Sequence, residues 1–114
     1  MKVKVRTNHK LGIPKAIINK LNMNDTKRVC IVAYDSETFF IKKQFNISDI
    51  KSFFIDICPV VRRGYRWHYY YITIPPDLMR KMPSIKIGGY VYVYININKD
   101  IVVTTIPPID FSKK

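Results

Sequence analysis

Apolar and charged residues alternate at the start of the chain. The even-numbered positions hold cations, Lys2, Lys4 and Arg6, and the odd-numbered positions between them hold Val3 and Val5. Successive side chains of a β-strand point to opposite faces of the sheet, so a period of two is typical of a half-buried strand. The pattern therefore predicts a strand over residues 2–7 that buries its valines and presents its cations on one solvent-facing side.

The next residues predict a turn, a second strand and a short helix. Residues 8–10 are polar, and residues 11–13 give a short apolar strand before Pro14, which a helix tolerates in its first turn. Apolar residues then recur at helical spacing over residues 15–23. The Asn and Asp side chains at the end of this segment favour a turn that stops the helix.

The remainder of the first 43 residues predicts a hairpin. Residues 28–33 and 38–41 are rich in the β-branched and aromatic side chains that strands favour. Residues 34–37 between them are mostly polar and suit a turn. The predicted order is therefore strand, turn, strand, helix, strand, strand.

The same order of elements recurs later in the chain. Leu11-Gly12-Ile13-Pro14 is matched by Ile72-Thr73-Ile74-Pro75, a displacement of 61 residues. After one inserted residue the match continues at apolar strand positions, with Val29, Ile31 and Ile41 opposite Val91, Val93 and Val103. The second set predicts a strand over residues 65–74, a helix over 76–82, and strands over 90–95 and 101–106.

These patterns predict a mainly β fold of the α+β type with short helices, built from two units that share one hydrophobic core. The first unit spans residues 1–43 and the second residues 62–108, followed by a basic tail at 109–114. Residues 44–61 are predicted to be a linker, in which Ser48 and Asp49 can cap a short helix that runs through residue 54.

The charge of the chain favours a polyanionic partner. Twenty Lys and Arg stand against eight Asp and Glu, a formal net charge of +12 over 114 residues. Residues 1–43 carry +7, residues 44–61 carry −1 and residues 62–114 carry +6, so two basic blocks flank a neutral middle. Such a field attracts nucleic acid first and anionic membrane second.

A basic strand and turn lead into the segment Leu11-Gly12-Ile13-Pro14-Lys15, and a short amphipathic helix follows it. This pattern resembles the AbrB/SpoVT/MazE-type swapped-hairpin DNA-binding domains. The resemblance covers residues 2–43 and, with fewer matches, residues 65–105. In that family two copies of the unit interleave their hairpins into one small barrel. The resemblance thus implies a swapped-hairpin AbrB-like barrel of two tandem copies, as an intrachain pseudo-dimer or a homodimer, acting as a transcriptional regulator that binds duplex DNA.

The resemblance also implies which residues contact DNA. Family members bind through basic residues of the first strand and of the turn before the Ile-Pro pair, positions that hold Lys4, Arg6, His9 and Lys10 here, with Lys2 and Lys15 beside them. In the second unit the candidates are Arg62, Arg63, Arg66 and His68. Contacts of Lys and Arg with phosphates would supply most of the affinity.

Three alternatives remain open from the sequence. One is a single-stranded nucleic-acid or RNA-binding module, in which an aromatic strand face stacks bases: Tyr65, Trp67, Tyr69 and Tyr71. A barrel core or dimer interface is the preferred interpretation of that face. The second is an antitoxin, although residues 107–114 are short for a toxin-wrapping tail. The third is a protein-interaction role in which the charge serves solubility.

The sequence argues against catalysis, metal binding and a membrane anchor. It contains no glycine-rich phosphate loop and no nucleophile motif, so we expect no enzyme, no cofactor and no small-molecule substrate. His9 and His68 have no partner at metal-ligand spacing. Cys30 and Cys58 are interpreted as core thiols, with a single bridge as the alternative. Neither a membrane span nor a signal peptide is predicted, so we expect a cytoplasmic, nucleoid-associated protein.

Overall fold

Nine antiparallel strands and a few short helices make up the part of the chain that the structure describes. This computed structural model describes residues 1–23, 25–43, 55–63 and 69–107. In chain order the elements are β1 (Lys2–Arg6), η1 (Thr7–His9), β2 (Lys10–Ile13), α1 (Lys15–Lys20), β3 (Arg28–Ala33), β4 (Thr38–Lys42), β5 (Ile55–Pro59), β6 (Val61–Arg63), β7 (Tyr69–Thr73), α2 (Pro76–Lys81), β8 (Tyr90–Ile95) and β9 (Ile101–Thr104). The predicted mainly β class with short helices is confirmed.

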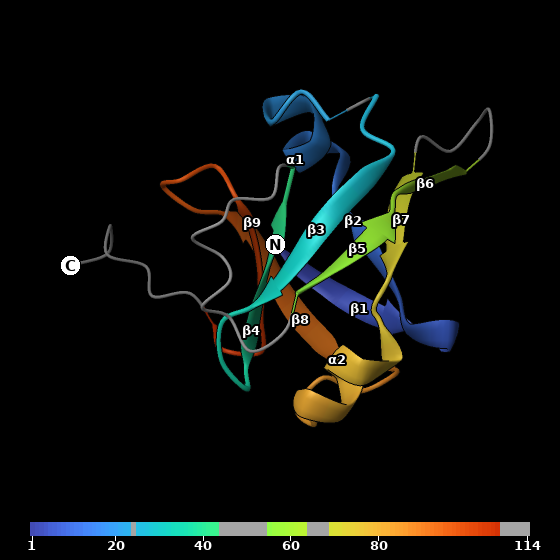
Figure 1. The fold of residues 1–114 in the computed structure, drawn as a ribbon, viewed down its shortest axis with the longest axis vertical. Coiled ribbons are helices and arrows are strands. Elements are labelled where there is room, and N and C mark those ends of the chain that lie inside the picture. The colour runs from blue at the N-terminus through green and yellow to red at the C-terminus, as the bar shows by residue number, and fades with distance from the viewer. Residues whose placement is uncertain (24, 44–54, 64–68, 108–114) are drawn as a thin grey trace.

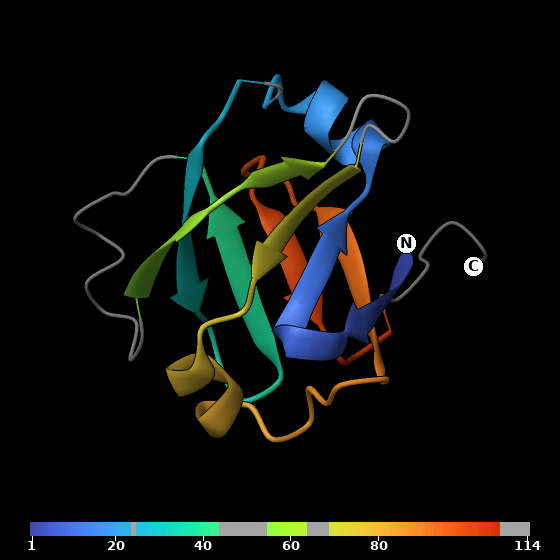
Figure 2. The ribbon, with the colours of Figure 1, turned by 90° about the vertical axis from the view of Figure 1, so that its right-hand side faces the viewer.

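The strands form one sheet that curls into a nearly closed barrel (Figure 1 and Figure 2). The strand order is β5-β3-β4-β9-β8-β1-β2-β7-β6. The two outermost strands of that order, β5 and β6, are separated in the chain only by Val60. One segment therefore pairs with β3 at one edge of the sheet and with β7 at the other, which brings the two edges together. Across this seam the Cys58 thiol donates to the Thr73 carbonyl oxygen at 3.6 Å.

Four strand pairs join the two halves of the chain. In these pairs β1 lies beside β8, β3 beside β5, β2 beside β7 and β4 beside β9. The β2–β7 ladder sets Leu11 opposite Ile72, the residue with which the sequence repeat aligns it. Because these ladders cross between the halves, the sheet is complete only when both halves fold together.

Strand alternation places one hydrophobic core inside the barrel. Val5, Leu11, Phe39 and Ile72 are fully buried, and they come from β1, β2, β4 and β7. A single cluster of apolar side chains joins residues of both halves. Full burial of an aliphatic or Phe side chain contributes about 1.5–3 kcal/mol to folding, so this shared core is the main source of stability.

The two α-helices lie at opposite ends of the barrel (Figure 1 and Figure 2). Each follows a proline with extended ψ, 135° at Pro14 and 139° at Pro75. Their inward side chains are apolar and buried: Ile17 and Ile18 in α1, and Leu78 in α2. The helix predicted over residues 15–23 ends at Lys20, since Asn22 takes a left-handed φ of 54°.

The second half of the sheet begins earlier than predicted. Residues 44–61, predicted to be a linker, supply β5, which pairs with β3 over five residues. Pro59 ends this strand opposite Arg28, a position where the missing N–H of proline is tolerated. The strand predicted over residues 65–74 is β7, Tyr69–Thr73. Residues 65–68 and the helix predicted through residue 54 lie outside the described residues.

Candidate nucleic-acid interface

The outer face of β1 presents three cations. Lys2, Lys4 and Arg6 are exposed, whereas Val3 is half-buried and Val5 is fully buried on the inner side. The alternation predicted for this strand is therefore confirmed. Residues two apart on a strand lie roughly 7 Å apart, so an extended anion can meet the three charges in succession.

One shallow groove gathers four of the predicted contact residues. Lys2, Lys4 and Arg6 line it together with Lys15, the first residue of α1. The groove has a volume of about 320 Å³, and no acidic residue of the described chain lines it. The remainder of its lining is uncharged and includes Gly12, Ile13 and Pro14. By charge and position the groove suits a phosphate backbone.

The turn after β1 fixes His9 and Lys10. Asn8 and His9 take left-handed φ values of 64° and 59°, a region that Asn visits more readily than most residues. The His9 carbonyl oxygen accepts a hydrogen bond from the Ile74 N–H at 2.9 Å. The Lys10 ammonium lies 5.0 Å from the centroid of the Tyr71 ring, a contact that contributes about 0.5–1 kcal/mol. Both residues are half-buried and border the basic strand.

Tyrosines of β8 share the outer face with the cations of β1. Three of them alternate with buried valines along the strand: Tyr90, Tyr92 and Tyr94. Tyr90 pairs with Lys4 across the strands and is 54% exposed, and the Lys2 ammonium lies 4.7 Å from its ring centroid. The sequence interpretation overlooked this face, although the same period of two that identified β1 would have found it.

The buried aromatic residue of β7 is Tyr70, with 4% exposure, whereas Tyr71 is half-buried opposite Gly12 on the outer side. The barrel-core interpretation of this strand face is therefore wrong at Tyr71, which contacts Lys10 instead. Its interpretation as a dimer interface stays a prediction. Tyr65 and Trp67 lie outside the described residues.

Two of the basic residues predicted in the second half, Arg62 and Arg63, lie on a strand that is not adjacent to β1. Arg62 and Arg63 belong to β6, opposite Tyr70 and Tyr69 of β7. In the sheet order β2 and β7 separate this strand from β1. Arg66 and His68 lie outside the described residues.

A glycine turn holds β1 in place. The Gly88 N–H donates to the Val5 carbonyl oxygen, and the Val5 N–H donates to the Gly89 carbonyl oxygen, both at 2.8 Å. Gly88 has a φ of 84°, which a residue with a Cβ rarely adopts. A Cβ on Gly89 would lie 3.1 Å from the Lys86 carbonyl oxygen. This turn therefore fastens the basic strand.

Cys30 and Cys58 are both buried and not bridged, which confirms the prediction of core thiols. Burial raises the pKa of the Cys58 thiol from 9.0 to about 11, with smaller contributions from Asp56 and Cys30. The thiol is therefore protonated at neutral pH and a poor nucleophile. Within the described ranges no group of three or more His, Cys, Asp or Glu is arranged to hold a metal ion. The helices described in this structure are all too short or too polar to cross a membrane.

Comparisons of this chain with protein-family models, curated proteins and solved structures find no match.

Proposed function

We propose that this chain is a transcriptional regulator that binds duplex DNA on the outer face of β1 and the turn that follows it. The observation that carries the proposal is the groove in which Lys2, Lys4, Arg6 and Lys15 converge without an acidic residue in its described lining. The net charge of +12 supports the same partner. Contacts of these cations with phosphates release counterions and supply most of the affinity. Arg6 is suited to guanine edges, and DNA shape offers a second source of selectivity.

We further propose that the barrel is an AbrB-like swapped-hairpin fold made of two copies of one unit. The β2–β7 register supports this, because Leu11 lies opposite Ile72, its own match 61 positions away. In the β4–β9 ladder, Phe40 lies opposite Val102, which is 62 positions away, the displacement of the repeat after the inserted residue. Approximate two-fold symmetry about the centres of both ladders has this consequence.

The two-copy arrangement favours an intrachain pseudo-dimer. Since one chain supplies both units of the proposed barrel, a monomer can present the β1 groove. Sedimentation of the free protein at the mass of one chain is the expected result. A mass of two chains would favour the homodimer.

A second candidate function is binding of single-stranded nucleic acid. The observation that favours it is Tyr90, which is half exposed beside the ammonium groups of β1 and continues into an outward row of tyrosines. Stacking of a base on an aromatic ring contributes about 1–3 kcal/mol per base, whatever its sequence.

Fluorescence anisotropy with labelled duplex and single-stranded DNA of equal length and random sequence separates these candidates. We expect tighter binding to the duplex, with the Tyr90→Ala variant unchanged. Tighter binding to the single strand that is lost in Tyr90→Ala would favour the second candidate. Absence of binding to either probe at low salt would contradict both and leave a protein-interaction role.

A further inference from the structure

A second cationic pocket lies at one end of the β4–β9 ladder. Lys20, Lys43 and Lys99 line a pocket of about 260 Å³, which is separate from the β1 groove. Its floor contains the buried apolar side chains of Met23 and Ile41. No acidic residue among those described lines this pocket. Three positive charges thus converge on one small volume, and their mutual repulsion is not offset by a carboxylate in its lining.

Local structure brings these lysines together from three segments. Lys20 ends α1, Lys43 follows β4, and Lys99 stands in the turn between β8 and β9. The Lys43 ammonium donates to the carbonyl oxygens of Leu21 and Asn22 at 3.4 and 3.3 Å. These bonds hold the Lys43 side chain against the loop after α1.

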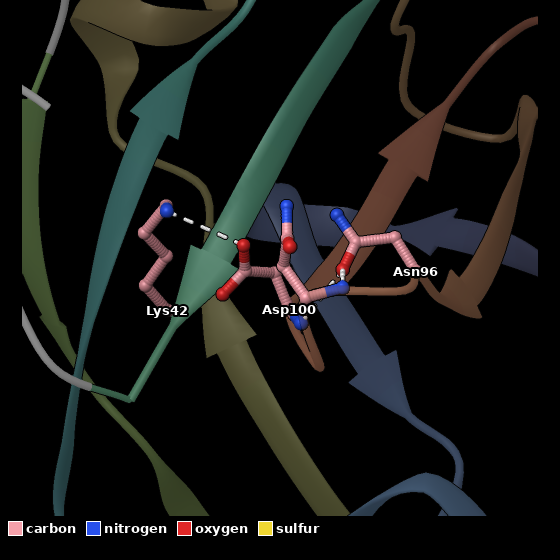
Figure 3. Close-up of polar contacts among 4 residues, drawn as sticks. Lys42, Asn96 and Asp100 are labelled. Carbon is pink, nitrogen blue, oxygen red and sulfur yellow. Dashed lines mark hydrogen bonds and ion pairs between the residues drawn. The ribbon is translucent and has the colours of Figure 1, made fainter.

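The turn that carries Lys99 is fixed by hydrogen bonds. The Asn96 side-chain oxygen accepts from the backbone N–H groups of Asn98 and Asp100 at 3.0 and 2.9 Å. The Asp100 carboxylate is paired with Lys42 at 3.2 Å (Figure 3). Asp100 is paired with Lys42 and does not line the pocket. The charge of Lys99 is therefore added to those of the two other lysines in the lining.

At the opposite end of the same ladder, a carboxylate accepts hydrogen bonds from two hydroxyl groups. Since Thr38 faces Thr104 and Ile41 faces Ile101, positions 37 and 105 flank one end of the ladder and positions 43 and 99 flank the other. At the first end the Glu37 carboxylate accepts hydrogen bonds from the Ser84 hydroxyl, at 3.1 Å, and from the Thr105 hydroxyl. An acid there joins the loop after α2 to the end of β9.

At the lysine end the same positions carry different chemistry. The displacement of 62 residues that relates the strands after the inserted residue sets Lys99 in the place of Glu37 and Lys43 in the place of Thr105. Asn22 lies in the loop after α1, as Ser84 lies in the loop after α2. Lys99, Lys43 and Asn22 all line the pocket. Where the first end has two hydroxyl donors and one acid, this end has two ammonium donors, an amide and a third ammonium from Lys20. It supplies donors and positive charge, but its described residues include no acidic acceptor.

We infer that the pocket between Lys20, Lys43 and Lys99 binds a phosphate group, which provides the oxygen acceptors that Glu37 provides at the other end of the ladder. Phosphate oxygens accept charge-assisted hydrogen bonds from several ammonium groups at once. The phosphate belongs either to a free phosphorylated molecule or to a nucleic-acid backbone. Lys15 and Lys20 stand at the two ends of α1, about 7.5 Å apart along the helix axis, and Lys15 lines the β1 groove while Lys20 lines this pocket.

The test is an NMR titration of the isotopically labelled full chain with inorganic phosphate at constant ionic strength, with sodium chloride as reference. We expect saturable shifts in the amide signals of residues 20–23, 43 and 99. The Lys20→Gln/Lys99→Gln variant should bind phosphate about tenfold more weakly or worse. The charge-matched Lys27→Gln/Lys86→Gln variant replaces two exposed lysines elsewhere and should bind as the wild type does. Retained shifts of the β2–β7 amides verify that both variants fold.

Two results would overturn the inference. One is the absence of saturable shifts beyond those that chloride causes, and the other is equal weakening in the two variants. Binding of duplex DNA by the same variants identifies the source of the phosphate: stronger weakening in Lys20→Gln/Lys99→Gln assigns it to DNA, and equal affinities assign it to a free phosphorylated molecule. Since the residues of the β1 groove are unchanged in these variants, the inference and the proposed DNA binding can fail separately.

Discussion

Arg6 and Lys10 lie directly opposite one another across the β1–β2 pair. Directly paired residues of antiparallel strands project to the same face, and like charges in that position destabilise the sheet by roughly 0.2–1 kcal/mol. An anion that lies across both residues is attracted by both positive charges. The pair therefore marks the place where we expect a DNA phosphate to bind.

Replacement of both residues, Arg6→Ala with Lys10→Ala, should weaken duplex binding by about tenfold or more, because two phosphate contacts are lost. The free energy of unfolding should change by about 1 kcal/mol or less, since loss of the Lys10–Tyr71 contact is offset by relief of repulsion. The Lys27→Ala/Arg28→Ala variant, in which two exposed cations just before and at the start of β3 are removed, serves as a charge-matched control. Unchanged affinity in a folded double variant would mean that the contact surface lies elsewhere.

The centre of the β2–β7 ladder should tolerate truncation of its buried side chains poorly. Leu11 is fully buried opposite Ile72, and Leu11→Ala is expected to cost about 2–5 kcal/mol through lost burial and the cavity left behind. Ile97→Ala, at a position 95% exposed, should cost about 0.5 kcal/mol or less. Urea unfolding monitored by far-UV circular dichroism measures both, and similar costs at the two positions would argue against this core.

Gly88 should resist substitution because of its backbone conformation. With φ at 84°, Gly88→Ala is expected to destabilise the chain by about 1–2 kcal/mol, although a Cβ there would meet no atom within 4 Å. Ile87→Ala, one residue earlier and 52% exposed, provides the comparison. Hydrogen exchange at the Val5 amide should accelerate in Gly88→Ala alone, because the bonds from the turn to β1 loosen. Unchanged exchange at Val5 would mean that the turn does not hold the strand.

The Cys58 thiol should make stability decrease at alkaline pH. Its pKa is about 11 in the folded chain against 9.0 without the fold, so the folded state keeps the proton when the unfolded state has lost it. This contribution is fully present below pH 9 and is lost as the pH rises from 9 towards about 11. Relative to Cys58→Val, the wild type should therefore lose free energy of unfolding across that interval. Parallel pH profiles for the two proteins would contradict the assignment.

The elements of the first half could be predicted because their periodicity is unbroken. The alternation from Lys2 to Arg6 and the helical spacing after Pro14 each occur within one short segment, so local sequence determines them. The strand β5 was missed for the opposite reason. It contains no basic alternation and lies in the segment interpreted as a linker, and only its pairing with β3 makes it a strand.

The two cationic sites also differ in how far local sequence predicts them. Three of the four groove cations belong to β1, so strand alternation alone predicts that they share a face. Lys20, Lys43 and Lys99 come from segments far apart in the chain, and they meet only because of the register between β4 and β9. No local pattern carries that register, which depends on long-range pairing.

The most direct test of the proposed DNA contact is a salt titration of duplex binding by the wild type and by Lys4→Gln/Arg6→Gln/Lys15→Gln. The logarithm of the binding constant falls against the logarithm of salt concentration with a slope of about −0.9 per phosphate contact. We predict a steep slope for the wild type and a slope lower in magnitude by about 2–3 for the groove variant. The charge-matched Lys27→Gln/Arg28→Gln/Lys81→Gln variant replaces three exposed cations away from β1 and should stay close to the wild type. Identical slopes for the groove variant and its matched control would contradict binding of DNA on the β1 face.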